Sequence, residues 1–162
     1  MTKAVKAIPD GHHAVTPSLV VHDADAAIRF YQQAFGAVEV ARFPNPNGKG
    51  ILHAVIKIGD SLVFLSDEFP DMGNRSPKTL GGTSAGIYLY VEDVDALYPK
   101  AVAAGAQPRV PLMDMFWGDR YGRVVDPFGY EWALATHKED VSPEEMGQRA
   151  LAFFAKQSKP PG

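Results

Sequence analysis

Apolar residues recur along this chain with two different periods, which predict strands and helices. The runs at 51–58 and 61–66 are rich in Val, Ile and Leu, and the Gly59-Asp60 pair between them is typical of a two-residue hairpin turn. Apolar residues also lie at helical spacing over 28–35, and Gly36 is a common residue just past the end of a helix. The first part of the chain is therefore expected to contain a helix followed by a hairpin.

This order of patterns occurs twice. Residues 19–26 (LVVHDADA) correspond to residues 89–96 (LYVEDVDA), and each segment passes from a strand pattern to an Asp-x-Asp pair that can cap a helix. The second helix is expected to end at Gly105. Further strands are expected at 120–125 and 130–136, and weaker strand patterns lie at 38–43 and 109–113. The sequence thus predicts an α+β fold built from a duplicated unit of one strand, one helix and two or three further strands.

The composition of the connecting segments predicts the domain boundaries. A linker or lid loop is expected at 67–83, where Pro, Gly, Ser and Asp are frequent. A final helix is expected after Ser142, because Pro143 and Glu145 follow it as in a capping box. The full prediction is a tail at 1–13, a single domain at 14–137 made of modules 14–66 and 84–137, and a C-terminal helix and tail at 138–162.

Side chains alternate along a strand, so an assumed turn assigns each residue to a face of the sheet. A two-residue turn in the first hairpin places His53 opposite Ser66. The same turn in the second hairpin places Glu131 opposite Val124 and puts Arg120 on the face of Glu131. In each module one face is apolar and the other mixes polar, aromatic and small residues. The mixed face is typical of pocket lining, and a solvated surface is the alternative.

Two residues on the mixed face are candidates for catalysis. His53 can act as an acid or base or anchor a ligand, or it can simply be hydrogen-bonded within the sheet. Glu131 can act as a general base or bind a cationic group. The alternative for Glu131 is an ion pair with Arg120, Arg123 or Lys57.

Candidate substrate-binding residues lie on or beside the same face. Arg120 can bind a carboxylate or phosphonate-like group through its planar guanidinium, or it can pair with Asp114 or Asp119. The aromatic rings can stack on a flat ligand. The predicted set is Thr16, Ser18, Phe64, Ser66, Tyr88, Tyr90, Trp117 and Arg120.

Composition and charge narrow the classes of function. The 16 basic and 19 acidic side chains give a net charge of −3, which argues against a nucleic-acid-binding surface. The chain has no Cys, so disulfides, zinc–thiolate sites and a thiol nucleophile are excluded. No apolar run approaches the ~18–20 residues of a membrane span, and the segment 1–13 lacks the apolar core of a signal peptide. A cytoplasmic protein without a membrane partner is expected.

Several segments resemble the vicinal oxygen chelate superfamily, which includes glyoxalase I, bleomycin-resistance proteins, fosfomycin-resistance enzymes and extradiol dioxygenases. The duplicated units and the turn at 126–129 (DPFG) carry this resemblance. The segments 15–21 (VTPSLVV), 30–37 (FYQQAFGA) and 117–122 (WGDRYG) are similar to the PhnB-like branch. The resemblance implies two βαβββ modules, each forming half of a curved open barrel, in a protein that is expected to be a homodimer.

The resemblance also implies where a metal would bind. Enzymes of the superfamily hold a divalent metal with His, Gln and Glu, and the matching positions here are Thr16, Phe64, Gly86 and Ala133. None of these is a good ligand, so a protein without metal or other cofactor is expected.

Three functions remain open at this stage. The first expectation is a metal-independent small-molecule binder with an aromatic-lined concave pocket. The second is a superfamily enzyme of lyase, isomerase or dioxygenase type that acts on a small oxygenated substrate. The third is a non-catalytic interaction module that uses the C-terminal helix or the linker.

Overall fold

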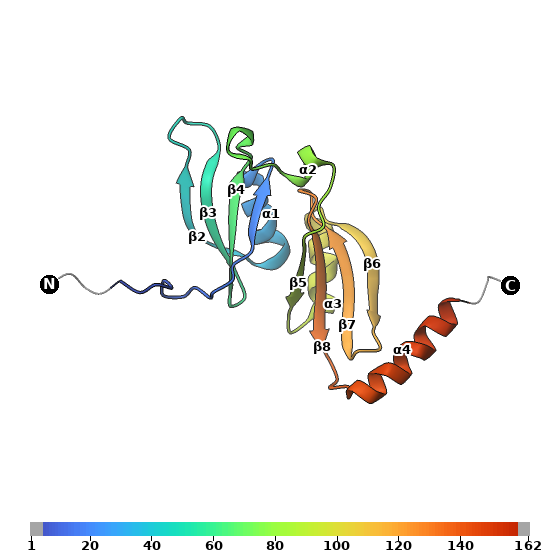
Figure 1. Cartoon of the computed structure of the whole chain (residues 1–162). Coiled ribbons are helices and arrows are strands. Elements are labelled where there is room, and N and C mark those ends of the chain that lie inside the picture. Colours follow the sequence, from blue (N-terminus) through green and yellow to red (C-terminus); the bar gives the residue numbers. More distant parts are fainter. Residues whose placement is uncertain (1–4, 159–162) are drawn as a thin grey trace. The chain divides into compact units, whose positions relative to one another are not determined.

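The computed structural model describes residues 5–158, and the chain divides into two compact units, 1–83 and 84–162. Each unit contains a four-stranded sheet and one helix that packs on it (Figure 1). In both units the order of elements is strand, helix and three strands, as the resemblance implied. The expected α+β fold of two βαβββ modules is therefore confirmed.

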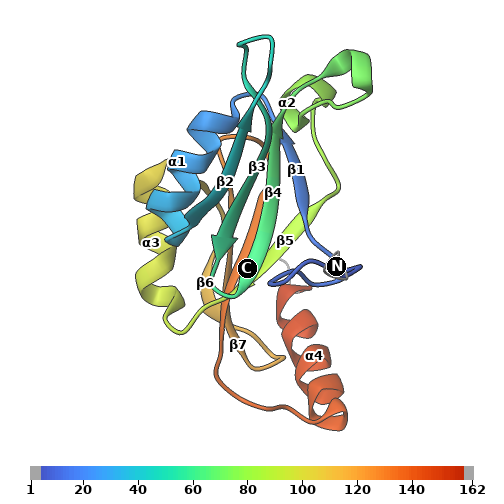
Figure 2. The same ribbon diagram turned by 90° about the vertical axis from the view of Figure 1, so that its left-hand side faces the viewer.

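The first unit is built around α1. Its elements are β1 (Ser18–Val21), α1 (Ala24–Phe35), β2 (Val38–Pro44), β3 (Ile51–Ile58) and β4 (Ser61–Asp67). The strand order is β1-β4-β3-β2, and β1 runs parallel to β4 while the other pairs are antiparallel. Figure 2 shows α1 against one face of this sheet. Ile28 and Tyr31 of the helix and Ile56 and Leu65 of the sheet are almost fully buried and form its core.

The second unit repeats this topology with a further helix at its end. Its elements are β5 (Gly86–Tyr90), α3 (Val94–Ala104), β6 (Gln107–Asp114), β7 (Asp119–Val125), β8 (Glu131–His137) and α4 (Pro143–Gln157). The strand order is β5-β8-β7-β6, with β5 parallel to β8. Val124, Trp132 and Leu134 form the buried face of the sheet, on the side of α3.

The two main helices begin and end as the sequence predicts. The Asp23 and Asp93 side chains accept hydrogen bonds from the amides of Ala26 and Ala96, three residues on, at 2.9 and 3.0 Å. Gly36 and Gly105 follow the last helical residues with positive φ angles of 68° and 124°. Glycine adopts this conformation without the steric cost that a Cβ atom adds, so both helices end there.

The segment between the modules is more ordered than expected for a linker. It contains a 3₁₀ turn, η1 (Pro70–Met72), and a short helix, α2 (Pro77–Leu80), that Ser76 caps. Ser76 is fully buried and its amide donates to Glu68. The polar composition therefore indicates local hydrogen-bonded turns here.

The predicted pairing of β7 with β8 is wrong by one residue. Glu131 pairs with Val125, and Val124 pairs with Trp132. The connection between the strands has five residues, 126–130, and includes Gly129 with a φ of 94°. A two-residue turn was assumed, and an odd loop length shifts every partner by one position. Arg120 consequently lies on the α3 side of the sheet, away from the face of Glu131.

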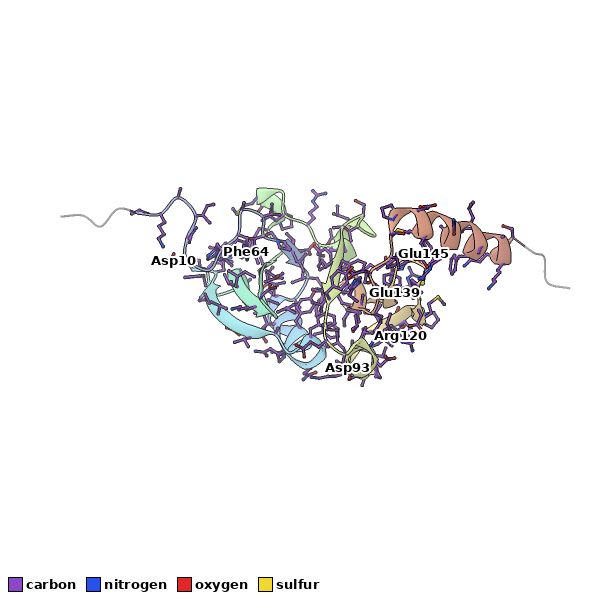
Figure 3. All side chains as sticks on the ribbon, turned by 90° about the horizontal axis from the view of Figure 1, so that it is seen from below. Asp10, Phe64, Asp93, Arg120, Glu139 and Glu145 are labelled. Carbon is purple, nitrogen blue, oxygen red and sulfur yellow. The ribbon has the colours of Figure 1, made fainter. Side chains whose placement is uncertain are left out.

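The helix α4 begins as predicted, with the Ser142 hydroxyl accepting a hydrogen bond from the Glu145 amide at 3.2 Å. None of its residues is buried. Arg149 binds Glu139 and Glu145, which lie near the start of the helix (Figure 3), and Phe153 and Phe154 contact Phe116. Over residues 5–158 there is no helix with the length and apolar character needed to cross a membrane.

Candidate functional site

The face of the second sheet opposite α3 carries three tyrosines, and we call it the tyrosine face. Tyr88 and Tyr90 lie on the edge strand β5, and Tyr121 lies on β7. The central strand β8 contributes Ala133 next to Tyr88 and Ala135 next to Tyr90. Because alanine side chains are short, the tyrosine rings have room to lie across β8.

One end of this face is hollow, and we call the hollow the tyrosine pocket. Its volume is about 220 Å³, and Gly86 and Ala133 leave space that larger side chains would occupy. Tyr88 and Tyr121 supply aromatic walls, with ring centroids 5.8 Å apart. Arg123 and Glu131 supply the charged part of the lining. Small residues among large aromatic and polar ones are typical of a ligand site.

The guanidinium of Arg123 and the carboxylate of Glu131 form an ion pair at 2.7 Å. Their side chains are 40% and 37% exposed, so solvent screens the pair. The Nε atom of Arg123 is buried and has no hydrogen-bond partner among the described residues. The pair therefore presents a donor beside an acceptor in the lining of the pocket.

A buried carboxylate, Asp119, anchors two of the three rings of the tyrosine face, Tyr88 and Tyr90. Its Oδ2 atom accepts hydrogen bonds from the Tyr88 and Tyr90 hydroxyls, both at 2.9 Å, and from the Trp117 indole at 3.0 Å. Its Oδ1 atom lies 2.8 Å from Nδ1 of His137, which forms a second contact with Asp140 at 2.8 Å. The Asp119 side chain is only 2% exposed. These four contacts converge on one buried group and fix Tyr88, one of the two rings that line the tyrosine pocket.

These contacts shift the pKa values of the cluster. Burial alone raises the pKa of Asp119, but the hydrogen bonds from His137 and the three aromatic donors hold that pKa below its ordinary value. The hydrogen bond to Asp119, with that to Asp140, raises the pKa of His137. Burial, with the hydrogen bond to Asp119, raises the pKa of Tyr88. Hydrogen bonding thus favours the carboxylate form of Asp119 and the imidazolium form of His137, and burial favours the neutral form of Tyr88.

A second hollow, about 560 Å³ in volume, lies between the β6–β7 turn and the segment after β8. It is lined by Asp114, Met115, Gly118, Asp119, Lys138 and Glu139. No aromatic side chain contributes to it, and its charged groups are mostly carboxylates. The tyrosine pocket, with its two aromatic rings, has a lining that suits an organic ligand better than this second hollow does.

Two of the predicted site residues of the first unit, His53 and Phe64, belong to a group of ring contacts. The His53 ring lies between Phe43 and Phe64, with centroids 6.0 and 4.8 Å away. Ser18 pairs with Phe64, and Ser66 with Val20, as parallel neighbours on β1 and β4.

Thr16 precedes β1 and is partly buried. Phe64 lies on the first sheet (Figure 3). Glu131 belongs to the other unit, so the structure places the two candidate catalytic residues in different modules.

Of the predicted residues in the second unit, Tyr88 and Glu131 line the tyrosine pocket. Tyr90 and Trp117 are joined to it through Asp119. Arg120 instead binds Asp95 of α3 at 3.0 Å and approaches Asp114 at 3.5 Å. Figure 3 shows Arg120 on the side of Asp93, where α3 begins.

Sequence reasoning missed Asp119 and His137 as members of the site. An acidic residue inside the aromatic segment 117–122 was the available signal, because a carboxylate in a half-buried strand requires donors. The sequence does not identify those donors, because Tyr88, for example, is 31 residues from Asp119 in the chain. The side chain of His137 is 52% exposed although both of its ring nitrogens are engaged.

The superfamily's metal does not fit the residues present. Thr16, Phe64, Gly86 and Ala133 offer no imidazole or carboxylate at the positions that the resemblance assigns to ligands. The nearby carboxylate of Glu131 is already paired with Arg123. Among residues 5–158 no three His, Asp or Glu side chains are grouped so that they could hold a metal ion. The residues at these positions therefore do not fit the metal ion of the superfamily's enzymes.

Comparison with known proteins defines the class to which the duplicated fold belongs. The sequence profile of the Glyoxalase/Bleomycin resistance protein/Dioxygenase superfamily matches residues 11–134. The chain belongs to this superfamily, as the sequence segments had indicated.

Individual relatives agree with this assignment. The Mycobacterium tuberculosis protein Rv0887c, described as uncharacterized, is 47% identical over 136 residues, which span 82% of this chain and 79% of the relative. The X-ray structure of the Arabidopsis thaliana At5g48480 product is 26% identical with a TM-score of 0.61, covering 76% of this chain and 98% of that chain. A PhnB protein from Bacillus cereus shares the fold, with 17% identity and a TM-score of 0.58 over 76% of this chain and 99% of that chain.

Proposed function

We propose that this protein binds a small organic molecule in the tyrosine pocket without the help of a metal ion. The observation that supports this most directly is the hollow of about 220 Å³ over Gly86 and Ala133, bordered by Tyr88, Tyr121 and an ion pair. Apolar and aromatic walls provide the free energy of burial, and the few polar groups orient the ligand. The superfamily contains bleomycin-resistance proteins, and binding without turnover is one of the functions that this fold serves.

The polar groups of the second unit favour binding over proton transfer. Asp119 and His137 are engaged with each other, and this contact lowers the pKa of Asp119 and raises that of His137. The raised pKa of Tyr88 makes its hydroxyl a poor acid. Glu131 is paired with Arg123. A general acid or base needs a lone pair or proton that is free to reach the substrate, and these groups are already engaged with one another.

A variant that fills the pocket tests the proposal. A Cβ atom at Gly86 would lie 3.8 Å from its nearest neighbour, the carbonyl oxygen of Glu131, which is an ordinary contact. Gly86→Leu is therefore expected to fold and to occupy the hollow. In a thermal-shift screen of small organic compounds, a true ligand raises the melting temperature of the wild type but not that of Gly86→Leu.

The matched control is Gln107→Leu, which adds the same side chain at an exposed position of β6 outside the pocket. It should respond like the wild type. A ligand that stabilises Gly86→Leu as much as the wild type binds elsewhere and contradicts the proposal.

An exposed apolar strip on α4 favours a second candidate, the non-catalytic interaction module. Leu151 and Phe154 are 76% and 56% exposed. Large exposed apolar side chains on one helix are typical of contact surfaces. The contact to test is the expected homodimer: if α4 makes it, Leu151→Glu shifts the wild-type dimer to monomer in sedimentation equilibrium, and an unchanged mass rejects this role for α4.

A further inference from the structure

We infer that the tyrosine pocket takes a neutral ligand with one planar ring that carries a hydrogen-bond donor beside an acceptor, as a carboxamide does. This inference rests on the proposed function and specifies the ligand of the same site. Three features of the pocket carry it: its volume, its aromatic walls and the ion pair at its edge.

The volume sets the size of the group that enters. A protein cavity of about 150 Å³ holds one benzene ring. The tyrosine pocket, at about 220 Å³, has room for one six-membered ring and a small substituent. A fused two-ring system would have to extend beyond the lining residues into solvent.

The walls set the shape of that group. The Tyr88 and Tyr121 rings and the methyl group of Ala133 offer flat, apolar contacts. The Tyr88 hydroxyl is already donated to Asp119, so this residue presents its ring to the pocket rather than its hydroxyl. A planar ring that packs against these side chains gains both apolar burial and aromatic contact.

The ion pair between Arg123 and Glu131 determines which polar substituent the ligand can carry. Arg123 is a donor and Glu131 an acceptor, with 2.7 Å between the bonded atoms. A carboxamide can accept from the guanidinium through its oxygen and donate to the carboxylate through its NH₂ group. A carboxylate in the same place is repelled by Glu131, and an ammonium group is repelled by Arg123. Because the pair has no net charge, the neutral ligand is the one that neither residue repels.

Three probes of similar size test the inference: benzamide, benzoate and benzylamine, measured by ligand-observed NMR at the millimolar concentrations suited to such small ligands. The wild type is expected to bind benzamide the most tightly. Glu131→Gln removes the negative charge and keeps an acceptor, so benzoate binding should improve by about tenfold relative to wild type. Arg123→Gln should improve benzylamine binding by a similar factor, about tenfold.

Two controls separate this inference from the proposed function. Glu92→Gln makes the same charge change at an exposed residue outside the pocket and should leave the order of the probes unchanged. Gly86→Leu should abolish binding of all three probes.

If benzoate or benzylamine matches benzamide in the wild type, or if Glu131→Gln leaves the order unchanged, the ligand class is wrong. The same holds if none of the probes binds. The proposed function then still stands, provided that a compound from the wider thermal-shift screen binds the wild type and not Gly86→Leu.

Discussion

Asp119 is a buried carboxylate that several donors surround. It is 2% exposed and accepts hydrogen bonds from Tyr88, Tyr90 and Trp117 while contacting His137. In this account Asp119 acts through the rings that it holds and does not itself meet the ligand. Its loss should therefore appear first as a loss of stability.

Asp119→Ala is predicted to lower the free energy of unfolding by about 3 kcal/mol, because four hydrogen bonds to one charged, buried acceptor are lost together. Chemical denaturation followed by Trp fluorescence measures this, since Trp117 is one of the donors. The control is Asp114→Ala, whose side chain is 80% exposed, with an expected change below about 0.5 kcal/mol. Equal effects of the two variants would show that the Asp119 hydrogen bonds contribute little.

The Asp119–His137 contact predicts a pH dependence of stability. The pKa of His137 is raised from its ordinary 6.5, so its contribution is complete below pH 6.5 and is lost as the pH rises through the raised value. The pKa of Asp119 is lowered from 3.8, so its contribution is complete above pH 3.8 and is lost as the pH falls through the lowered value. The stability difference between wild type and His137→Gln should thus be largest between pH 3.8 and 6.5. A difference that grows above pH 6.5 would contradict the assignment.

The ring of Tyr88 and its hydroxyl have separate roles, which two variants distinguish. Tyr88→Phe keeps the pocket wall and removes one hydrogen bond to Asp119, so a ligand of the pocket should still bind. Tyr88→Ala removes the wall and should weaken binding by about tenfold or more. Isothermal titration calorimetry compares the two affinities, and equal losses would show that the ring does not contact the ligand.

At this scale the sequence predicted the individual pocket residues only in part. Tyr88 and Glu131 lie where alternation along a strand suggests, because both strands are regular. Arg120 was placed on the wrong face because the length of the loop that joins β7 to β8 decides which residues share a face with Glu131. Asp119 depends on side chains brought together by the sheet, which periodicity along the chain does not reveal.

At the scale of elements, the two modules use equivalent positions to hold a helix to its sheet. The Asp67 carboxylate at the end of β4 accepts from the amide of Ala24, the first residue of α1, at 2.7 Å. The Thr136 hydroxyl of β8 accepts from the amide of Val94, the first residue of α3, at 2.9 Å. Asp67 also accepts from the Ile51 amide at 2.6 Å and so fixes the start of β3.

Asp67→Ala is predicted to destabilise the protein by about 2 kcal/mol, because two partly buried amides lose a charged acceptor. Asp71→Ala, at an exposed residue of η1, is the control and should change stability by less than about 0.5 kcal/mol. Urea denaturation monitored by circular dichroism gives both values. A loss for Asp67→Ala no larger than that of the control would mean that solvent replaces these hydrogen bonds.

The elements themselves were the most predictable level of the structure. Caps, glycine stops and apolar periodicity are local signals, and they located α1, α3, α4 and the main strands. The sequence did not predict the length of the loop at 126–130. The Asp126 carboxylate stabilises a loop of five residues by accepting hydrogen bonds from the amides of Phe128 and Tyr130. Such side-chain-to-backbone hydrogen bonds alter loop length without changing the composition that marks a turn.

At the scale of the whole molecule, duplication has given two modules with one topology and different chemistry. The first carries His53 between two phenylalanine rings, and the second carries the tyrosine pocket and the Asp119 cluster. Superfamily membership accounts for the topology. Superfamily membership does not identify the ligand or the reaction, because one fold serves many functions. The expectations of His53 catalysis and of a homodimer remain predictions.

The central claim is that the tyrosine pocket binds a small molecule without a metal. The most direct measurement is a two-dimensional ¹H–¹⁵N NMR titration of chelator-treated, isotope-labelled protein with a library of single-ring compounds. The account predicts that at least one compound shifts the amide signals of Gly86, Tyr88 and Ala133, and that Gly86→Leu abolishes these shifts. Shifts that appear only after a divalent metal is added, or that leave these three signals unmoved for every compound, would contradict it.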